Sequence, residues 1–407
     1  MKIPTTIDEN AGQLRRALVK FTVWLDGYGE TSWDHQSYYA GFFGRCAKGL
    51  YYKNKYLGIA AVSPMVFSEA FFPAARRLFH QPMRLPIADA HYAMGFAFLH
   101  EATGEAGYLD RATHFLEVLQ KTRSPEYQEY CWGYPFDWVT RTGTIKKHTP
   151  LITTTPYCFE AFAQVQKLRP RDEWKNVLES ITRHATTDIK DFPYGDHGMT
   201  CSYTPFDKGG IVNASAYRAG MLVQAAKLFQ RKDLLEITTR NVTFVLAAQN
   251  PNGSWPYAKD GVRDFVDHFH TCFVMKGLAK VYLLTGDQRV FEALENGVRY
   301  YLKNLFDEDG MPRPFSVAPR LTVYRNELYD CAECINLCVL LKKVFPELEK
   351  TLDTVVAGVL RDWVKPDGSF RSRRLKFGWD NVPMHRWAQS QMFRALSFHL
   401  REINTRL

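Results

Sequence analysis

The sequence predicts an all-α fold, an (α/α)6 toroid in which six inner helices are ringed by six outer helices. Apolar residues recur at helical spacing in paired segments, and Gly or Pro residues separate the two helices of a pair. The pairs repeat roughly every sixty residues. A chain of 407 residues exceeds the roughly 250–300 residues that one core usually serves. A repeat fold avoids this limit because each unit packs only on its neighbours.

The clearest pair is expected at residues 87–100 and 108–121, with a break at Thr103-Gly104. Residues 1–85 fit the repeat poorly, so we expect them to supply closing helices and an irregular aromatic loop within a single domain of residues 1–407. Residues 86–407 carry the regular repeats. A solenoid remains the alternative, because repetition alone does not establish that the ring closes. The later helices are expected at 155–168 with 174–184, 212–229 with 234–248, 269–284 with 290–305, 328–344 with 348–364, and 384–400.

Polar turns recur after the second helix of a pair and are followed by aromatic or proline residues. Asn-Gly and Asp-Gly sequences favour tight turns, so these loops are predicted to hold short β-hairpins. The instances are Asn252-Gly253, Asp309-Gly310 and Asp367-Gly368, with weaker relatives at residues 132–138 and 192–195.

The composition combines many aromatic residues (14%) with a formal net charge of +9. The aromatic surplus fits either a large core or a cleft that stacks on sugar rings. A basic excess attracts anions, but no long basic run is present, so nucleic acid is not an expected partner. The first residues lack the apolar core of a signal peptide, and the eight cysteines are scattered, a pattern typical of reduced thiols. We therefore expect a cytoplasmic protein, and no motif predicts a cofactor or a metal site.

Polar and aromatic residues gather at the expected N-termini of the inner helices. In such a ring the loops that lead into the inner helices lie on one face, so these N-termini would surround a shared cleft. Helix N-termini carry unpaired N–H groups and partial positive charge, which favours an anionic ligand. A capping role does not explain a tyrosine or histidine that recurs there. The residues that we expect to bind substrate are His91, Tyr92, Tyr157, Tyr217, Trp132, Trp255, Tyr257, Trp379, Asp34 and Arg386.

The histidines of Asp267-His268-Phe269-His270 are the first catalytic candidates. Residues at i and i+2 do not share a helix face, so a metal pair would need extended backbone there. The catalytic interpretation is that one of the two histidines moves protons at neutral pH and is oriented by a carboxylate such as Asp267. A structural, hydrogen-bonded histidine is the alternative, and the sequence does not choose between His268 and His270.

Further catalytic candidates open the last two inner helices. His385 is a second candidate base, and its neighbour Arg386 is suited to bidentate carboxylate binding. Tyr329 could donate a hydrogen bond to a developing anion, and Glu327 or Asp330 could act as a general acid.

The repeated helix pairs, Gly253-Ser254-Trp255-Pro256, the Asp267–His270 motif and His385-Arg386-Trp387-Ala388-Gln389 resemble the α/α-toroid (six-hairpin) carbohydrate-active proteins. The similarity is to the bacterial polysaccharide-biosynthesis branch, with the helical domain of glucuronyl C5-epimerases and the toroid polysaccharide lyases as related groups. It covers most of the chain after residue 85. The resemblance implies an enzyme that acts on an acidic, uronic-acid-containing glycan or its lipid-linked precursor, beside membrane-associated polysaccharide assembly proteins.

Three function classes follow. Epimerases and lyases of uronic acids share abstraction of the proton α to the carboxyl group, for which His268 or His270, Arg386 and Tyr329 could supply the groups. A glycoside hydrolase needs two carboxylates roughly 5–10 Å apart, and Asp34, Asp267, Glu327 and Asp330 are the candidates. A non-catalytic glycan-binding subunit of an assembly complex is the third class. A terpene-cyclase-like toroid would need an Asp-rich motif that faces an apolar cavity. The sequence contains no convincing motif of this kind, so this class is disfavoured.

Overall fold

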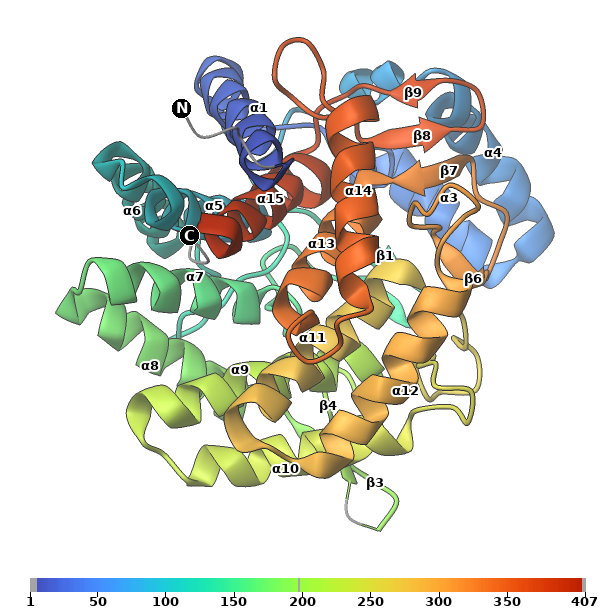
Figure 1. Ribbon diagram of the computed structural model, residues 1–407. Coiled ribbons are helices and arrows are strands. Elements are labelled where there is room, and N and C mark those ends of the chain that lie inside the picture. The colour runs from blue at the N-terminus through green and yellow to red at the C-terminus, as the bar shows by residue number, and fades with distance from the viewer. Residues whose placement is uncertain (1–5, 197, 405–407) are drawn as a thin grey trace.

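Six inner helices form a closed ring in the computed structural model, which describes residues 6–404 except residue 197. Each inner helix packs on the next, and α15 packs on α5, so the ring closes (Figure 1). The inner helices are α5 (Pro86–Thr103), α7 (Thr155–Leu168), α9 (Val212–Phe229), α11 (His268–Thr285), α13 (Leu328–Leu341) and α15 (Ser390–Asn404). The outer helices are α6 (Ala106–Lys121), α8 (Asp172–Thr187), α10 (Asp233–Ala247), α12 (Gln288–Asn304), α14 (Leu348–Asp362) and α1 (Thr6–Tyr28). The expected toroid architecture is confirmed.

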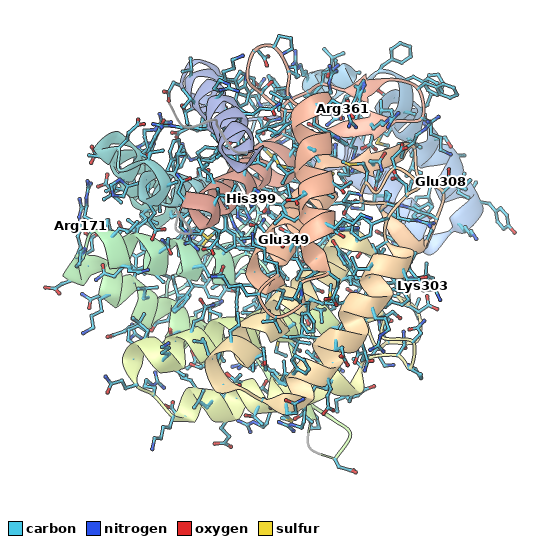
Figure 2. All side chains as sticks on the ribbon, in the orientation of Figure 1. Arg171, Lys303, Glu308, Glu349, Arg361 and His399 are labelled. Carbon is cyan, nitrogen blue, oxygen red and sulfur yellow. The ribbon has the colours of Figure 1, made fainter. Side chains whose placement is uncertain are left out.

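Inner and outer helices differ in sequence because neighbouring helices cover the inner ones on all sides and the outer ones on one side only. In α5 every residue from Pro86 to Leu99 is buried, since neighbours lie on all sides. In α8 only one face is buried, and its apolar residues follow helical spacing. Charged side chains such as Lys303 and Arg361 project from the outer helices into solvent (Figure 2).

Short strands occupy the loops that lead into the inner helices. β1 (Trp138–Thr140) pairs with β2 (Gly143–Ile145), and β3 (Asp191–Tyr194) with β4 (Gly198–Cys201), as antiparallel hairpins. β5 (Val266–Asp267) pairs with β6 (Phe315–Val317). β7 (Tyr324–Glu327), β8 (Arg373–Leu375) and β9 (Trp379–Asp380) form a three-stranded sheet. Strands β5 and β7 end directly at the first residues of α11 and α13.

Two of the predicted turns, Asp309-Gly310 and Asp367-Gly368, close short hairpin loops. Gly310 (φ 74°) and Gly368 (φ 91°) take the left-handed conformation in these turns, which side chains with a Cβ rarely adopt. Single antiparallel bridges, Phe306 to Pro312 and Val364 to Phe370, hold the two ends of the turns together. At Asn252-Gly253 the Asn250 N–H donates to the Ser254 carbonyl (2.8 Å), and among the described residues no bridge joins the two sides of that turn.

The N-terminal segment contributes one ring helix and a separate helical hairpin. Helix α1 packs on α15 in the sixth outer position, the closing role expected for this part of the chain. Residues 1–85 were expected to supply closing helices and an irregular aromatic loop, and residues 37–78 within them form α2 (Ser37–Ala40), α3 (Phe42–Lys53), α4 (Lys55–Phe71) and the 3-10 helix η1 (Pro73–Leu78). Helices α3 and α4 pack on each other at the edge of the molecule (Figure 1). The apolar residues of α4 lie on several sides of the helix, so its sequence lacks the hydrophobic periodicity by which the ring helices were predicted.

The last inner helix starts with an irregular turn. A continuous helix was predicted from residue 384, but His385–Gln389 forms a π-helix before α15 begins. The Gln389 side chain accepts from the Phe370 N–H (2.9 Å) and donates to the Phe370 carbonyl (2.7 Å). These bonds fix the widened turn against the preceding loop. Across the described residues, no helix combines the length and apolarity that crossing a membrane requires.

Glycines allow neighbouring inner helices to approach closely. A Cβ on Gly277 of α11 would lie 2.4 Å from the Ala216 carbonyl oxygen of α9, and Gly220 of α9 faces Gly277. Backbone atoms cannot move aside as a flexible side chain can, so only glycine fits between these two helices.

We predict that Gly277→Ala lowers the free energy of unfolding by about 1–3 kcal/mol, because the added methyl group overpacks the contact between α9 and α11. Gly49→Ala is the matched control. Gly49 lies within α3 with no atom near its Cβ position, so this substitution is expected to leave stability unchanged or raise it by up to about 1 kcal/mol. Chemical denaturation measures both variants, and equal effects would contradict the packing argument.

Candidate functional site

The ring brings residues from different repeats into one connected group at the N-termini of the inner helices. The Tyr257 ring contacts His270 edge-on with centroids 4.6 Å apart, and Phe269 lies 5.0 Å from Tyr329. Tyr329 in turn stacks on Trp387 with centroids 5.7 Å apart. Side chains of α11, α13 and the π-helix before α15 therefore form a continuous aromatic surface, although they are far apart in sequence.

Asp267 and His270 form a hydrogen-bonded pair at the start of α11. Asp267 caps the helix by accepting from the His270 backbone N–H (3.1 Å), and its other oxygen lies 2.6 Å from His270 Nδ1. The Asp267 side chain is 2% exposed, whereas that of His270 is 21% exposed. The carboxylate thus fixes one ring nitrogen, and the partly exposed imidazole keeps Nε2 for another partner.

His268 and His385 lie in enclosed positions. His268 contacts the Leu305 carbonyl through Nδ1 (3.1 Å) and the Tyr301 hydroxyl through Nε2 (2.8 Å). His385 contacts the Tyr92 hydroxyl (2.5 Å) and the Gly29 carbonyl (3.0 Å). Burial lowers the pKa of His268 to about 3 and that of His385 to about 4, so both rings stay neutral at physiological pH. Both nitrogens of each ring are occupied by contacts within the protein.

Arg386 is held by Asp34 through two hydrogen bonds, Nε to Oδ2 (2.7 Å) and Nη2 to Oδ1 (2.6 Å). Both side chains are at most 1% exposed. The guanidinium lies 3.7 Å from the centroid of the Trp387 ring and 4.8 Å from that of Tyr134. The charge of Arg386 is therefore balanced within the protein, and the side chain positions two rings of the aromatic surface.

Tyr134, Tyr203 and Tyr257 are partly exposed and surround the same region. Burial, with the other two phenols nearby, raises the pKa of Tyr203 well above its usual value, and burial raises that of Tyr257 to about 12. Burial also raises the pKa of Tyr329. These hydroxyls stay protonated at neutral pH and can donate hydrogen bonds. Sequence reasoning did not select Tyr134 and Tyr203, although Tyr134 lies in the aromatic run at residues 132–138.

Two carboxylic acids open α13 in different environments. Glu327 accepts from Arg373 Nε (2.7 Å), and Arg373 also donates to Glu69 of α4 (2.6 Å). Asp330 is fully buried, and neither of its oxygens has a hydrogen-bond partner. Burial, reinforced by the charge of Glu327, raises the pKa of Asp330 well above its usual value. Burial therefore favours the protonated form of Asp330.

Buried polar side chains fill the ring between the inner helices. The Tyr157 and Tyr217 hydroxyls are 2.6 Å apart, and Lys276 Nζ donates to Tyr157 (3.1 Å). Lys276 also forms an ion pair with Glu333, and burial still lowers its pKa to about 8. His91 and Tyr92 are also enclosed; Arg394 lies 2.9 Å from His91 Nδ1. These predicted binding residues lie in the interior of the ring.

Three predicted tryptophans lie outside the group. Trp132 and Trp255 are buried, and their indole N–H groups donate to the Leu119 and Val245 carbonyls (both 2.9 Å). The Trp132 ring also contacts Phe162 of α7, and the Trp255 ring lies against Gly297 of α12, so neither ring presents a face to a ligand. Trp379 is partly exposed on β9 and contacts Trp363 edge-on.

Lys48 of α3 brings positive charge to this region. Its ammonium lies 3.4 Å from Gln36 Oε1 and 5.3 Å from the Tyr39 ring centroid. Burial, followed by the charges of Arg320 and Arg386, lowers its pKa to about 8. These cations repel one another, which makes the surrounding space favourable for an anion.

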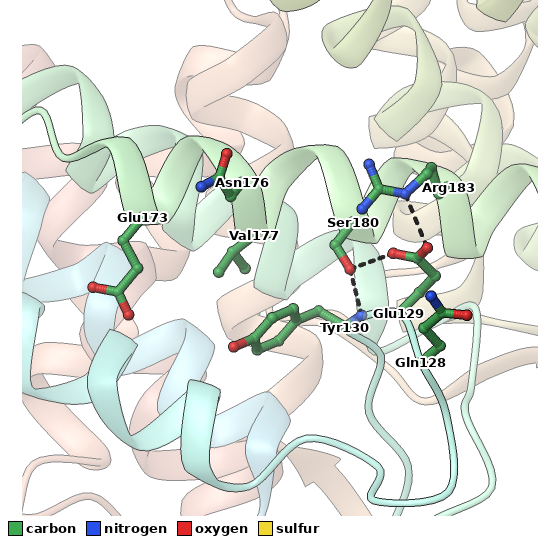
Figure 3. Close-up of a pocket in the computed structure, with 8 residues that line it drawn as sticks. All are labelled: Gln128, Glu129, Tyr130, Glu173, Asn176, Val177, Ser180 and Arg183. Atoms are coloured by element: carbon green, nitrogen blue, oxygen red, sulfur yellow. Dashed lines mark hydrogen bonds and ion pairs between the residues drawn. The ribbon is translucent and has the colours of Figure 1, made fainter.

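Two surface pockets lie on the outer helices, away from this group. The pocket in Figure 3, about 330 Å³, is lined by α8 and by residues 128–130 of the loop that follows α6. Its polar groups are paired with each other, since Glu129 binds both Arg183 (2.9 Å) and Ser180 (2.6 Å). The second pocket lies between α12 and Glu347. Within residues 6–196 and 198–404 no cluster of three or more His, Cys, Asp or Glu side chains is placed to hold a metal ion.

Solved structures of an epimerase, a lyase and a glycosyl hydrolase share this fold. Cellobiose 2-epimerase from Bacillus thermoamylovorans superposes with a TM-score of 0.62 at 10% identity, over 80% of this chain and 88% of that chain. A glycosyl hydrolase of family 88 from Bacteroides vulgatus gives 0.56 at 12% identity, over 83% and 98%. A polysaccharide lyase gives 0.56 at 10% identity, over 77% and 90%. No family model matches the sequence, and no curated protein matches it either.

We predict that Asp34→Asn lowers the free energy of unfolding by about 3–5 kcal/mol, because it leaves the buried Arg386 charge without its counter-ion. The double variant Asp34→Asn/Arg386→Met removes both charges and is expected to lose less. Glu105→Gln is the control, since it breaks the exposed ion pair with Arg15 and should cost less than about 1 kcal/mol. Similar losses for Asp34→Asn and Glu105→Gln would contradict the assignment of a buried ion pair.

Proposed function

We propose that the protein is a cytoplasmic carbohydrate-active enzyme of bacterial polysaccharide biosynthesis or modification. Its substrate is an acidic, uronic-acid-containing glycan or the lipid-linked precursor of one. The reaction begins by abstraction of the proton α to the sugar carboxylate, the step that epimerases and lyases share. The observation that carries this proposal is the Asp267–His270 pair, which places an oriented, partly exposed imidazole beside aromatic rings.

His270 is the base in this proposal. Asp267 accepts a hydrogen bond from Nδ1–H, so in the neutral ring the lone pair lies on Nε2 and can receive a proton. The same carboxylate stabilises the imidazolium that forms. His268 and His385 are assigned structural roles, because protein groups occupy both nitrogens of each ring.

The aromatic residues supply the rest of the site. Tyr257 and Trp387 are partly exposed and offer faces on which a sugar ring can stack. The protonated hydroxyl of Tyr257, next to His270, can donate a hydrogen bond to the anion that develops after proton abstraction. Arg386 holds Trp387 in place rather than binding substrate directly, since Asp34 already occupies its guanidinium.

The acidic nature of the substrate is supported by Lys48 and Arg320. Burial, followed by the positive charges of Arg320 and Arg386, lowers the pKa of Lys48, so the three cations lie near one another. Asp34 balances the charge of Arg386 but not those of Lys48 and Arg320. An anionic group of the substrate would therefore reduce the repulsion between Lys48 and the two arginines. The three similar structures named above, an epimerase, a lyase and a hydrolase, support sugar chemistry on this fold, but a fold does not by itself choose the reaction.

A glycoside hydrolase is the second candidate, and Asp330 favours it. A buried carboxylic acid whose pKa is raised has the property required of a general acid. Glu327, three residues earlier, would then be the second carboxylate. A glycan-binding subunit without activity is the remaining alternative from the sequence.

We predict that the protein incorporates deuterium at C5 of uronic-acid oligosaccharides in deuterated water, or generates the ultraviolet absorbance of an unsaturated product. His270→Gln should reduce the rate by about 10²–10⁴-fold, because it removes the proton acceptor. The control His114→Gln changes an exposed histidine and should keep full activity. His268→Gln should lower the melting temperature while preserving the rate per folded molecule.

Two results would refute the proton-abstraction proposal. One is full activity in His270→Gln. The other is binding of the oligosaccharide with neither isotope exchange nor new absorbance, which would favour the glycan-binding subunit. New reducing ends without either signal would transfer the assignment to the hydrolase.

For the hydrolase candidate we predict that Asp330→Asn abolishes the release of reducing ends, because an amide cannot protonate the leaving oxygen. Asn has nearly the volume of Asp and carries no charge, and burial favours the uncharged form of Asp330, so the melting temperature should change little. Reducing-end assays of the two proteins measure this. Unchanged hydrolysis in Asp330→Asn would remove the residue from the site.

A further inference from the structure

Exposed aromatic and aliphatic side chains concentrate on residues 42–79, which include α3, α4 and η1. We refer to these side chains as the α3–α4 face. Its most exposed members are Phe43 (85%), Tyr56 (86%) and Leu78 (86%). The face also includes Phe42, Leu57, Phe67, Phe71, Phe72 and Phe79, each about half exposed or more. Elsewhere in the described chain, the exposed aromatic rings are Phe206 and Phe377.

Neighbouring rings of the face contact each other, and Phe79 also packs on the buried Tyr38. The Phe42 and Phe43 centroids are 5.5 Å apart, and those of Phe67 and Phe71 are 4.8 Å apart. Phe377, in the loop between β8 and β9, stacks on Phe71 and extends the face. Monomeric proteins rarely expose large contiguous apolar surfaces, so a partner is expected to cover this one.

The charges around the face identify the kind of partner. Residues 37–80 contain six Lys or Arg residues, of which Arg76 is buried against Asp380 and Lys48 is partly buried, and one acidic residue, Glu69. Glu69 is paired with Arg373, so it does not offset the cations on the surface. Lys53, Lys55 and Arg77 are exposed beside the aromatic rings. Protein interfaces are depleted in lysine, whereas aromatic rings bordered by basic residues are typical of surfaces that bind anionic lipid.

We propose that the α3–α4 face docks on an anionic lipid bilayer. Its aromatic and aliphatic side chains enter the headgroup region, and Lys53, Lys55 and Arg77 contact the lipid phosphates. The inference does not depend on the reaction that the enzyme carries out. It also fits a lipid-linked substrate, because Glu69 of α4 connects through Arg373 to Glu327 at the start of α13. The docked face would therefore lie next to the candidate site.

Vesicle sedimentation tests the proposal with the full chain. The protein is mixed with vesicles of phosphatidylcholine containing phosphatidylglycerol, and with vesicles of phosphatidylcholine alone. We expect strong binding to the anionic vesicles, weaker binding to the neutral ones, and a loss of binding as salt rises. Lys53→Gln/Lys55→Gln should lower the partition coefficient by about 25-fold, since each basic residue near an anionic surface contributes a factor of about five.

The apolar contribution is tested with Phe43→Ser/Tyr56→Ser/Leu78→Ser, which should lose binding to both vesicle types by at least about tenfold. The matched control Phe206→Ser/Val262→Ser changes exposed apolar residues outside the face and should bind as the wild type does. Circular dichroism and melting temperature establish that each variant is folded; because the changed side chains are exposed, we expect wild-type values.

Three outcomes would overturn the proposal. The wild type could fail to bind anionic vesicles, or the triple variant could bind as tightly as the wild type. Sedimentation velocity without lipid provides the third. A wild-type dimer that the triple variant converts to a monomer would show that a second copy of this chain covers the face.

Discussion

Closure of the ring is the constraint on which the rest of the structure depends. Each inner helix must fit between two inner neighbours and an outer helix, so almost no position on it reaches solvent. Glycines therefore mark the closest contacts, with Gly95 against Phe393 and Arg394, and Gly220 against Gly277. Every charged group inside the ring must also find a partner, and Lys276 with Glu333 shows this requirement. The same closure directs the inner-helix N-termini toward one region.

The inner helices could be predicted well because their burial leaves a clear pattern. The predicted ranges 155–168 and 212–229 match α7 and α9. The other ring helices from α5 onward were found within a few residues, except where the π-turn at His385–Gln389 delays α15, and no range was predicted for α1. Helices α3 and α4 could not be predicted in this way. They pack on each other and on loops, and their exposed apolar residues obscure any one-sided period.

The candidate site was predictable where its contacts are local. Asp267 and His270 are three residues apart, so a cap and an oriented imidazole could be inferred from the motif. The choice between His268 and His270 could not, because it depends on contacts of His268 with Tyr301 and Leu305, more than thirty residues later in the chain. The pairing of Arg386 with Asp34 joins the two ends of the chain, and no spacing in the sequence reveals it. Trp132 and Trp255 were predicted to bind substrate, but they are buried between helices. A turn motif that recurs with the repeat can therefore serve helix packing rather than ligand binding.

The α3–α4 hairpin and the ring are connected through buried charges rather than through apolar packing alone. Arg373 is shared between Glu69 of α4 and Glu327 at the start of α13, and Arg76 of η1 pairs with Asp380 of β9. His35 lies between Glu327 and Asp380, at 3.7 Å and 3.5 Å, and burial holds its pKa well below the usual value. A hairpin that moved away would leave two arginines short of a counter-ion in a buried environment, which is costly. The hairpin is therefore held in one position relative to Glu327, and a surface that binds the α3–α4 face would also fix the orientation of the aromatic group beside His270.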